Sequence, residues 1–132
     1  MQKIEHIGIA VKSLAESIPL FEKLLNVECY KTESVESEKV NTAFFKISES
    51  KIELLESTDA NGVIAKFIDK KGEGVHHVAL EVMNINDEIA RLKNSGFVVL
   101  NEPKKGADNK LICFLHPKTT NGILIELCQE IK

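Results

Sequence analysis

The chain has 132 residues, of which 43% are hydrophobic and 28% charged, proportions that fit one soluble globular domain with its own core. Its formal net charge of −3 at pH 7 argues against binding to nucleic acid, because proteins that bind nucleic acid usually carry an excess of basic residues. No apolar run approaches the roughly 18 residues of a membrane-spanning helix, and the N-terminal residues lack the layout of a signal peptide, so a cytoplasmic protein without membrane contact is expected.

The first predicted elements are a strand that begins at His6 and a helix that follows it. In "HIGIAVKSLAESIPLFEKLLN" the apolar residues first alternate with a period of two, which is typical of a half-buried strand. Ser13 is a good N-cap residue, and Glu16, three residues later, has the spacing of a capping box. Pro19 falls in the first turns, so the helix is expected either to start late or to bend.

Three further strands and a connecting helix follow, because the chain between the first helix and the strand around Glu53 has room for two strands. "EKVNTAFFKI" (38–47) fits one strand, and "KIELLE" around Glu53 fits the next. Glu53 stands between aliphatic residues, where an ionised carboxylate is costly unless it is paired or bound to a metal. The segment 59–73, which contains "DANGVIAKFIDKK", is predicted to be a helical connector ended by its glycines.

The same pattern then recurs. "HVALEVMNINDEIARLKNSG" begins at His77, has a candidate N-cap at Asn84 with Asp87 three residues later, and ends at Gly96. "KLICFLHP" fits a middle strand, and "ILIELC" repeats the isolated carboxylate at Glu126. The three cysteines of the chain are scattered and odd in number, so buried, reduced thiols are expected rather than disulfides or structural zinc.

The repeat predicts an α+β fold made of two tandem β-α-β-β-β modules that form one concave mixed sheet. We expect a single domain over 1–132, with modules 1–58 and 74–132 joined by the connector 59–73.

Four residues of the repeat are candidates for one metal site. By strand parity they share the face opposite the helices: His6, Glu53, His77 and Glu126. Two imidazoles and two carboxylates suit a divalent transition metal. Each residue alone is more often a surface or strand-end residue, and only its recurrence in both copies favours a ligand. His76 faces the other way and is interpreted as structural, or as a residue that orients a ligand by a hydrogen bond.

The sequence resembles the vicinal-oxygen-chelate superfamily, which includes glyoxalase I and extradiol dioxygenases, and within it most closely the methylmalonyl-CoA epimerase family. The resemblance rests on "HIGIAV", "KIELLE", "VIAKFI", "GEGVHHVALEV", "FLHPK" and "GILIEL", which cover nearly the whole chain. It implies an enzyme of propionate metabolism, a homodimer, and a divalent metal held by the four residues above. Cobalt is the metal most expected from the resemblance, with zinc, nickel or manganese as alternatives. Many members of the family have Gln at the place of Glu53, so this site would be one charge more negative.

The implied reaction interconverts (2R)- and (2S)-methylmalonyl-CoA by removal of the proton at C2 through an enolate. A divalent cation would stabilise the negative charge that develops on oxygen. Inversion needs a proton carrier on each side of the planar carbon, and the resemblance points to Glu36 and Glu126. Glu38 or Glu33 would replace Glu36 if the strand register differs, and the whole segment could instead be a solvated strand edge.

Several basic residues are candidates for contacts with the substrate. His116, in "FLHPK", could lie near the substrate carboxylate or thioester, or could simply end a strand. Ammonium groups pair with phosphates, so the phosphates of coenzyme A could meet Lys104, Lys105, Lys110 and Lys118. A solvated loop is the alternative for each of these lysines.

Three other functions stay open at this point. Glyoxalase I, a lactoylglutathione lyase, shares the fold and a similar ligand set, but "IAKF" and "GEGVHH" favour the epimerase family. A ring-cleaving dioxygenase normally keeps three protein ligands, so four speak against it. A non-catalytic member of the superfamily would bind a small molecule without a complete set of metal ligands.

Overall fold

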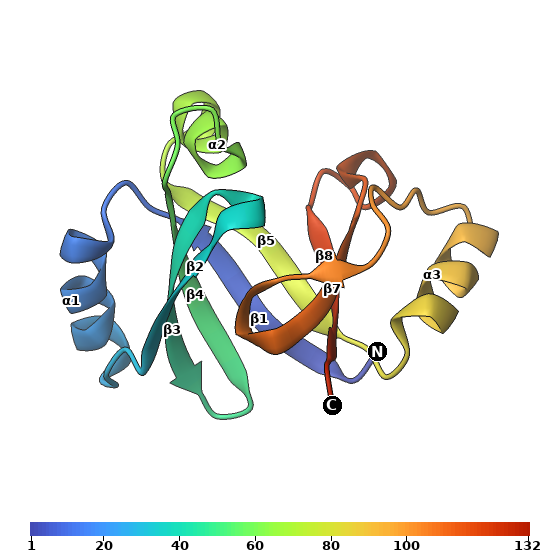
Figure 1. The fold of residues 1–132 in the computed structure, drawn as a ribbon, viewed down its shortest axis with the longest axis horizontal. Coiled ribbons are helices and arrows are strands. Elements are labelled where there is room, and N and C mark those ends of the chain that lie inside the picture. Colours follow the sequence, from blue (N-terminus) through green and yellow to red (C-terminus); the bar gives the residue numbers. More distant parts are fainter. The chain divides into compact units, whose positions relative to one another are not determined.

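The computed structural model describes residues 1–132 and divides the chain into two units (Figure 1). The first half comprises His6–His76, and the second half comprises Met1–Glu5 together with His77–Lys132. The division falls inside the first and fifth strands of the chain, so each of these strands contributes residues to both halves. None of the helices is both long and apolar enough to cross a membrane.

The first half is a four-stranded mixed sheet with two helices. Its elements are β1 (Lys3–Ala10), α1 (Leu14–Leu25), β2 (Lys31–Val35), the 3-10 turn η1 (Glu36–Glu38), β3 (Val40–Ile47), β4 (Ser50–Ser57) and α2 (Val63–Lys71). The strand order is β2-β3-β4-β1. β3 is antiparallel to both of its neighbours, whereas β1 and β4 are parallel because α1 carries the chain back between them.

The second half repeats this order of elements. It contains β5 (Gly74–Glu81), α3 (Ile85–Asn94), β6 (Lys104–Lys105), the turn η2 (Ala107–Asn109), β7 (Lys110–Leu115), the turn η3 (Pro117–Thr119) and β8 (Ile125–Glu130). β5 and β8 are parallel, and β7 is antiparallel to both β8 and β6. The start of the chain lies beside β5, where the Gln2 N–H donates to the Glu81 carbonyl at 2.8 Å. The α+β class and the β-α-β-β-β order of both modules are therefore confirmed.

Both long helices begin at the predicted caps. The Ser13 hydroxyl accepts from the Glu16 N–H at 3.3 Å, and the Asn84 side chain accepts from the Asp87 N–H at 3.0 Å. α1 begins directly after Ser13 and runs through Pro19, so the late start expected as one effect of Pro19 does not occur.

α1 and α3 each cover one face of their own sheet. Side chains of α1 pack on a core of Val11, Ala43, Phe45 and Leu54. Ile85 and Leu92 of α3 belong to the buried core of the second half, together with residues of β7 and β8. Figure 1 shows α1 and α3 beside the sheet of their respective halves.

The connecting helix packs on the other face of the first sheet. α2 begins at Val63 and ends at Lys71, within the segment predicted to be the connector. Ile64 is buried against Ala10, Val40 and Leu55, with Phe67 and Ile68 beside it. The face opposite α1, which was expected to be free of helices, is therefore covered by α2 at one end.

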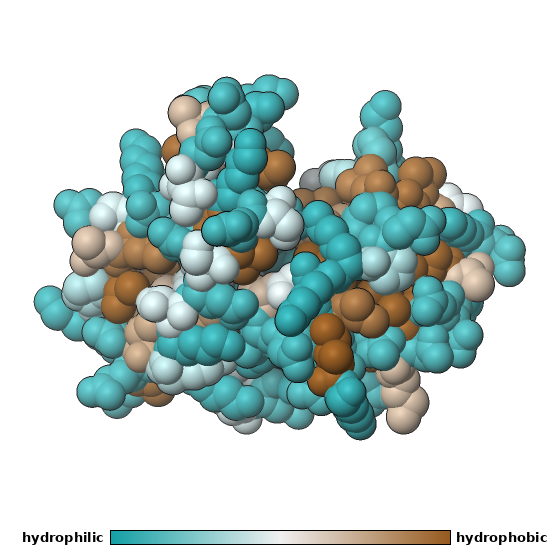
Figure 2. Space-filling model, viewed as in Figure 1, coloured by the Kyte–Doolittle hydropathy of each residue, from teal (hydrophilic) through white to brown (hydrophobic).

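Hydrophilic side chains cover most of the molecular face drawn in Figure 2, and hydrophobic side chains are interspersed among them. This surface agrees with the 28% of charged residues in the chain. Isolated hydrophobic side chains on a protein surface are normal and indicate no function by themselves.

A candidate metal and acid-base site

The first half buries a histidine beside a carboxylate. In the parallel pair of β1 and β4, Gly8 lies opposite Glu53 and His6 lies opposite Lys51, so all of these residues share one face. His6 Nδ1 is 3.1 Å from Glu53 Oε2, and the two residues are only 5% and 4% exposed.

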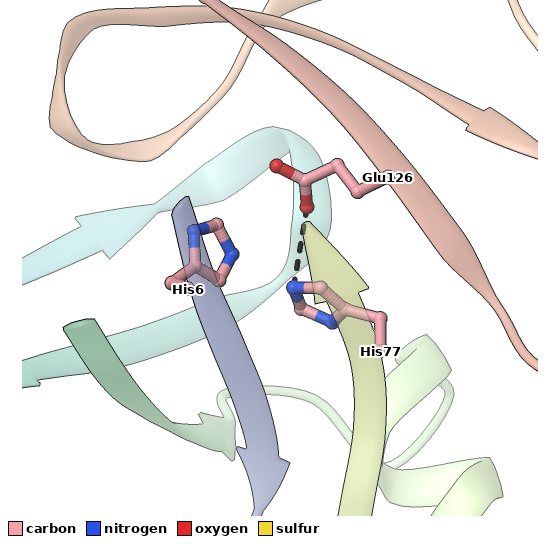
Figure 3. A group of neighbouring side chains, drawn as sticks. All are labelled: His6, His77 and Glu126. Carbon is pink, nitrogen blue, oxygen red and sulfur yellow. Dashed lines mark ion pairs between the residues drawn. The ribbon is translucent and has the colours of Figure 1, made fainter. Parts of the chain in front are cut away.

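The second half contains the same pair. Ala79 of β5 lies opposite Glu126 of β8, and His77 Nε2 is 3.2 Å from Glu126 Oε1. Both residues of this pair are buried. Figure 3 draws the interaction as a dashed line; the third side chain in the figure, His6, belongs to β1 and to the first half.

The two pairs occupy equivalent positions. In each half, the carboxylate lies opposite the small residue two positions after the histidine. This agreement confirms the prediction that histidine and carboxylate share a face within each module. It also shows that the repeat extends to the register of the sheets, which fixes the side-chain geometry.

An aromatic residue accompanies each carboxylate, and the sequence analysis missed both. Phe44 of β3 lies opposite Glu53, and Phe114 of β7 lies opposite Glu126. The ring of Phe114 meets the His77 ring edge to face, with centroids 6.0 Å apart. The sequence contains a phenylalanine in the middle strand of each module. Only the antiparallel register between strands shows that this residue lies opposite the carboxylate.

The distances within the pairs fit the ligands of a metal. Two ligand atoms at right angles, each ~2.1 Å from one cation, lie about 3 Å apart. The nitrogen–oxygen distances of 3.1 and 3.2 Å match this separation. Imidazole and carboxylate together suit divalent transition metals, and a carboxylate in such a place can also carry a proton.

The structure places Glu36 in a turn instead of a strand. β2 ends at Val35, and Glu36 is the exposed first residue of η1, whose turn is closed by a hydrogen bond from the Lys39 N–H to the Glu36 carbonyl. Glu36 therefore follows the strand on which it was expected, because the chain reverses through η1 between the antiparallel strands β2 and β3. Glu38 is half-buried in the same turn, and Glu33 lies in β2 with its carboxylate 3.3 Å from Lys31 Nζ.

His116 is held by the backbone around it. It caps η3, and its Nδ1 accepts from the Lys118 N–H at 3.0 Å. An acceptor nitrogen carries no proton, so neutral His116 has its proton on Nε2. The half-buried ring therefore keeps a donor for another group.

The candidate lysines do not form one group. Lys104 lies opposite Ile112, on the Glu126 face of the sheet, whereas Lys105 lies opposite Leu111 on the other face. Lys118 is exposed in η3. Lys110, a candidate for phosphate contact with a solvated loop as the alternative, is instead the buried first residue of β7, with Nζ 3.5 Å from Glu130.

His76 has a structural contact on the opposite face from His77. Its ring meets the ring of Phe67 edge to face, with centroids 5.0 Å apart. This contact links the start of β5 to α2. It supports the structural interpretation of the first histidine in the His76–His77 doublet.

Comparisons with known proteins show which family the chain resembles in sequence. Residues 5–114 match the family described as Glyoxalase/Bleomycin resistance protein/Dioxygenase superfamily. The chain is 36% identical over 130 residues to the ethylmalonyl-CoA/methylmalonyl-CoA epimerase of Cereibacter sphaeroides, with 96% of this chain and 97% of that protein covered.

Two solved structures are similar over almost their whole length. A variant of Streptomyces coelicolor methylmalonyl-CoA epimerase in complex with 2-nitronate-propionyl-CoA has a TM-score of 0.95 at 34% identity, with 100% of this chain and 99% of that chain covered. A methylmalonyl-CoA epimerase in complex with methylmalonyl-CoA and NH4+ has a TM-score of 0.94 at 34% identity, with 98% and 95% covered.

Proposed function

Because this chain belongs to the methylmalonyl-CoA epimerase family of the Glyoxalase/Bleomycin resistance protein/Dioxygenase superfamily, we propose that it interconverts (2R)- and (2S)-methylmalonyl-CoA. The observation that carries the proposal is the pair of buried histidine–carboxylate contacts in equivalent register. A fold that serves many activities does not by itself select one, so the proposal depends on these side chains and on the named relatives.

We assign one divalent metal to the two pairs together. His6, Glu53, His77 and Glu126 would hold it, with cobalt the metal we expect first and zinc, nickel or manganese as alternatives. The donor set and the distance within each pair support this assignment. When bound, the cation would supply Lewis-acid stabilisation of the negative charge that develops on the thioester oxygen.

The protein's own carboxylates would move the proton. We assign Glu36 as the base that takes the C2 proton on one side of the carbon. Glu126 would return a proton through a carboxylate oxygen on the other side. The exposure of Glu36 in η1 leaves its carboxylate accessible to a substrate, and the burial of Glu126 keeps bulk water away from its proton.

The test is exchange of the C2 proton in deuterium oxide. Purified protein is incubated with methylmalonyl-CoA, and incorporation of deuterium at C2 is followed by mass spectrometry. We expect exchange that is lost after removal of metal with a chelator and restored by a divalent cation. Isomerisation of the glutathione hemithioacetal of methylglyoxal without C2 exchange would instead identify a glyoxalase, and activity on neither substrate would favour a binding protein.

Glu36→Gln tests the base separately from the metal. The variant keeps the size of the side chain but removes its basicity, and we expect the exchange rate to fall by at least about 100-fold. Glu38→Gln is the matched control in the same turn, and it should retain exchange. Loss of exchange in Glu38→Gln but not in Glu36→Gln would assign the base to Glu38. Full activity of both variants would show that neither carboxylate of η1 acts as the base. Metal content should remain unchanged in both variants.

Further parts of the assignment concern contacts with the substrate. We propose that Lys104, Lys105 and Lys118 meet the phosphates of coenzyme A, and that His116 donates from Nε2 to the substrate. Among these lysines, Lys104 is the best-supported candidate for phosphate contact, because it lies on the same face of the sheet as Glu126. A homodimer in the cytoplasm completes the proposal, and its mass in solution is measured by light scattering.

A further inference from the structure

A buried hydroxyl without a hydrogen-bond partner lies on the histidine–carboxylate face of the first half. Thr42 is 0% exposed, and its Oγ1 contacts no hydrogen-bonding group. Burial removes a hydroxyl from water, so the absence of a replacement bond is unfavourable for the folded protein. Such a group needs an explanation, and one explanation is a ligand that accepts its hydrogen bond.

The sheet register places Thr42 next to the proposed site. Thr42 and Phe44 point to the same side of β3, and Phe44 lies opposite Glu53. Thr42 itself lies opposite Leu55, two residues after Glu53, so it occupies the next position on the same face as the proposed metal ligand. Along β3 it lies between that ligand and η1, the turn that carries Glu36.

The second half shows that the fold does not require a hydroxyl at this position. Ile112 is its equivalent, because it stands two residues before Phe114 just as Thr42 stands two residues before Phe44. Ile112 is buried in an apolar cluster with Ala79 and Cys128. A hydrophobic side chain therefore fills the same place in one module, while the other module keeps a polar atom there.

Thr42 lies beside the edge strand of the sheet. Its cross-strand neighbour on β2 is Glu33, whose side chain is 32% exposed. The hydroxyl consequently lies one residue from the solvent-accessible edge of the sheet. A substrate that extends from Glu36 to Glu53 would pass this position.

We propose that Thr42 is a substrate-binding residue whose hydroxyl donates a hydrogen bond to an oxygen of the malonyl group. The inference depends on the proposed epimerase function, which supplies the substrate. A bond to the carboxylate is made in the ground state and mainly lowers KM, whereas a bond to the thioester oxygen strengthens as charge develops and mainly raises kcat. Either oxygen would accept the hydrogen bond that the Thr42 hydroxyl lacks in the protein alone.

The test compares Thr42→Val with Thr42→Ser. Valine keeps the shape of the side chain and removes the hydroxyl, whereas serine keeps the hydroxyl. We expect Thr42→Val to lower kcat/KM for C2 exchange by about tenfold, the effect of one hydrogen bond, and Thr42→Ser to restore most of it. Because valine has no unsatisfied polar atom, we also expect the Tm of Thr42→Val to rise.

The combination of lower activity with higher Tm separates substrate binding from a structural role. Ile112→Val is the matched control, since it introduces the same side chain at the equivalent position and should leave KM and kcat unchanged. Wild-type kinetics for Thr42→Val would overturn the inference. Failure of the wild-type protein itself to exchange the C2 proton would overturn the proposed function instead, so the two failures are distinguishable.

Discussion

Two cysteine thiols are buried deep in the second half. Cys113 and Cys128 are both 0% exposed, as the sequence predicted, whereas Cys29, also predicted to be buried, is only half-buried. Burial raises the pKa of the Cys113 thiol to about 11, and the nearby carboxylates of Glu126 and Glu102 contribute to the increase. Burial also raises the pKa of Cys128. These thiols should therefore be poor nucleophiles in the folded protein.

The raised pKa of Cys113 predicts a loss of stability in alkali. Below the unfolded thiol pKa of about 8.5 the thiol is neutral in both states, so its contribution to stability is constant. As pH rises above that value, the unfolded state ionises first and is favoured, until pH passes the folded pKa of about 11. The urea midpoint should fall between about pH 8.5 and 10.5.

Cys113→Ala provides the comparison for this pH effect. The variant loses buried volume and is less stable at every pH, but its urea midpoint should depend less steeply on pH than that of the wild-type protein. Parallel pH profiles for the two proteins would contradict the assignment of the effect to this thiol.

The face of the sheet on which a single residue lies could be predicted where the apolar residues of its own strand alternate clearly. His6 and Glu53 stand on strands with clear alternation, so their shared face followed from the pattern, and the same holds for the second pair. Thr42 and Phe44 were missed because their relation to Glu53 depends on the register between two strands. The sequence of one strand does not determine that register.

At the scale of elements, each long helix is tied to the last strand of its module. The Leu14 N–H, at the start of α1, donates to Glu56 Oε1 at 2.7 Å. The Ile85 N–H, at the start of α3, donates to Gln129 Oε1 at the same distance. Glu56 and Gln129 each stand three residues after the buried carboxylate of their strand, so they point to the helix face of the sheet.

Gln129→Ala should destabilise the second half because it removes the hydrogen bond between Gln129 and the start of α3. The substitution removes the acceptor of the N–H of Ile85, a fully buried residue at the start of α3, and we expect a loss of about 1–3 kcal/mol in the free energy of unfolding. Gln129→Glu retains an acceptor oxygen and places negative charge at the helix N-terminus, as Glu56 does in the first half, so its stability should be close to wild type. Urea unfolding measures both, and equal loss in the two variants would show that the acceptor oxygen is not responsible.

The local parts of these elements were predictable, and the long-range parts were not. Ser13 and Asn84 were identified because an N-cap depends on a few neighbouring residues. The hydrogen bonds from the helix N-termini to Glu56 and Gln129 could not be predicted, because they depend on the parallel pairing of strands that are distant in sequence. The end of β2 at Val35 was not predicted, because charged residues occur both in β2 and in η1 and so mark no boundary between them.

At the scale of the molecule, the proposed function requires one cation shared by the two halves. Each half by itself supplies one imidazole and one carboxylate, fewer ligands than a stable transition-metal site normally has. A shared ion binds only the folded chain and therefore stabilises it by mass action, by about 2.7 kcal/mol at a free metal concentration 100 times Kd. Sharing also predicts a particular pattern among variants.

The variants His6→Ala and His77→Ala should each abolish the whole stabilisation by metal. Removing either ligand weakens the same binding event, so the double variant should lose no more of the metal-dependent Tm increase than either single variant. Metal titration by calorimetry should give one cation per wild-type chain, and His116→Asn should keep the full increase in Tm because it replaces a histidine outside the two pairs. Two separate ions would instead give two cations per chain, single variants that each retain part of the stabilisation, and losses that add in the double variant.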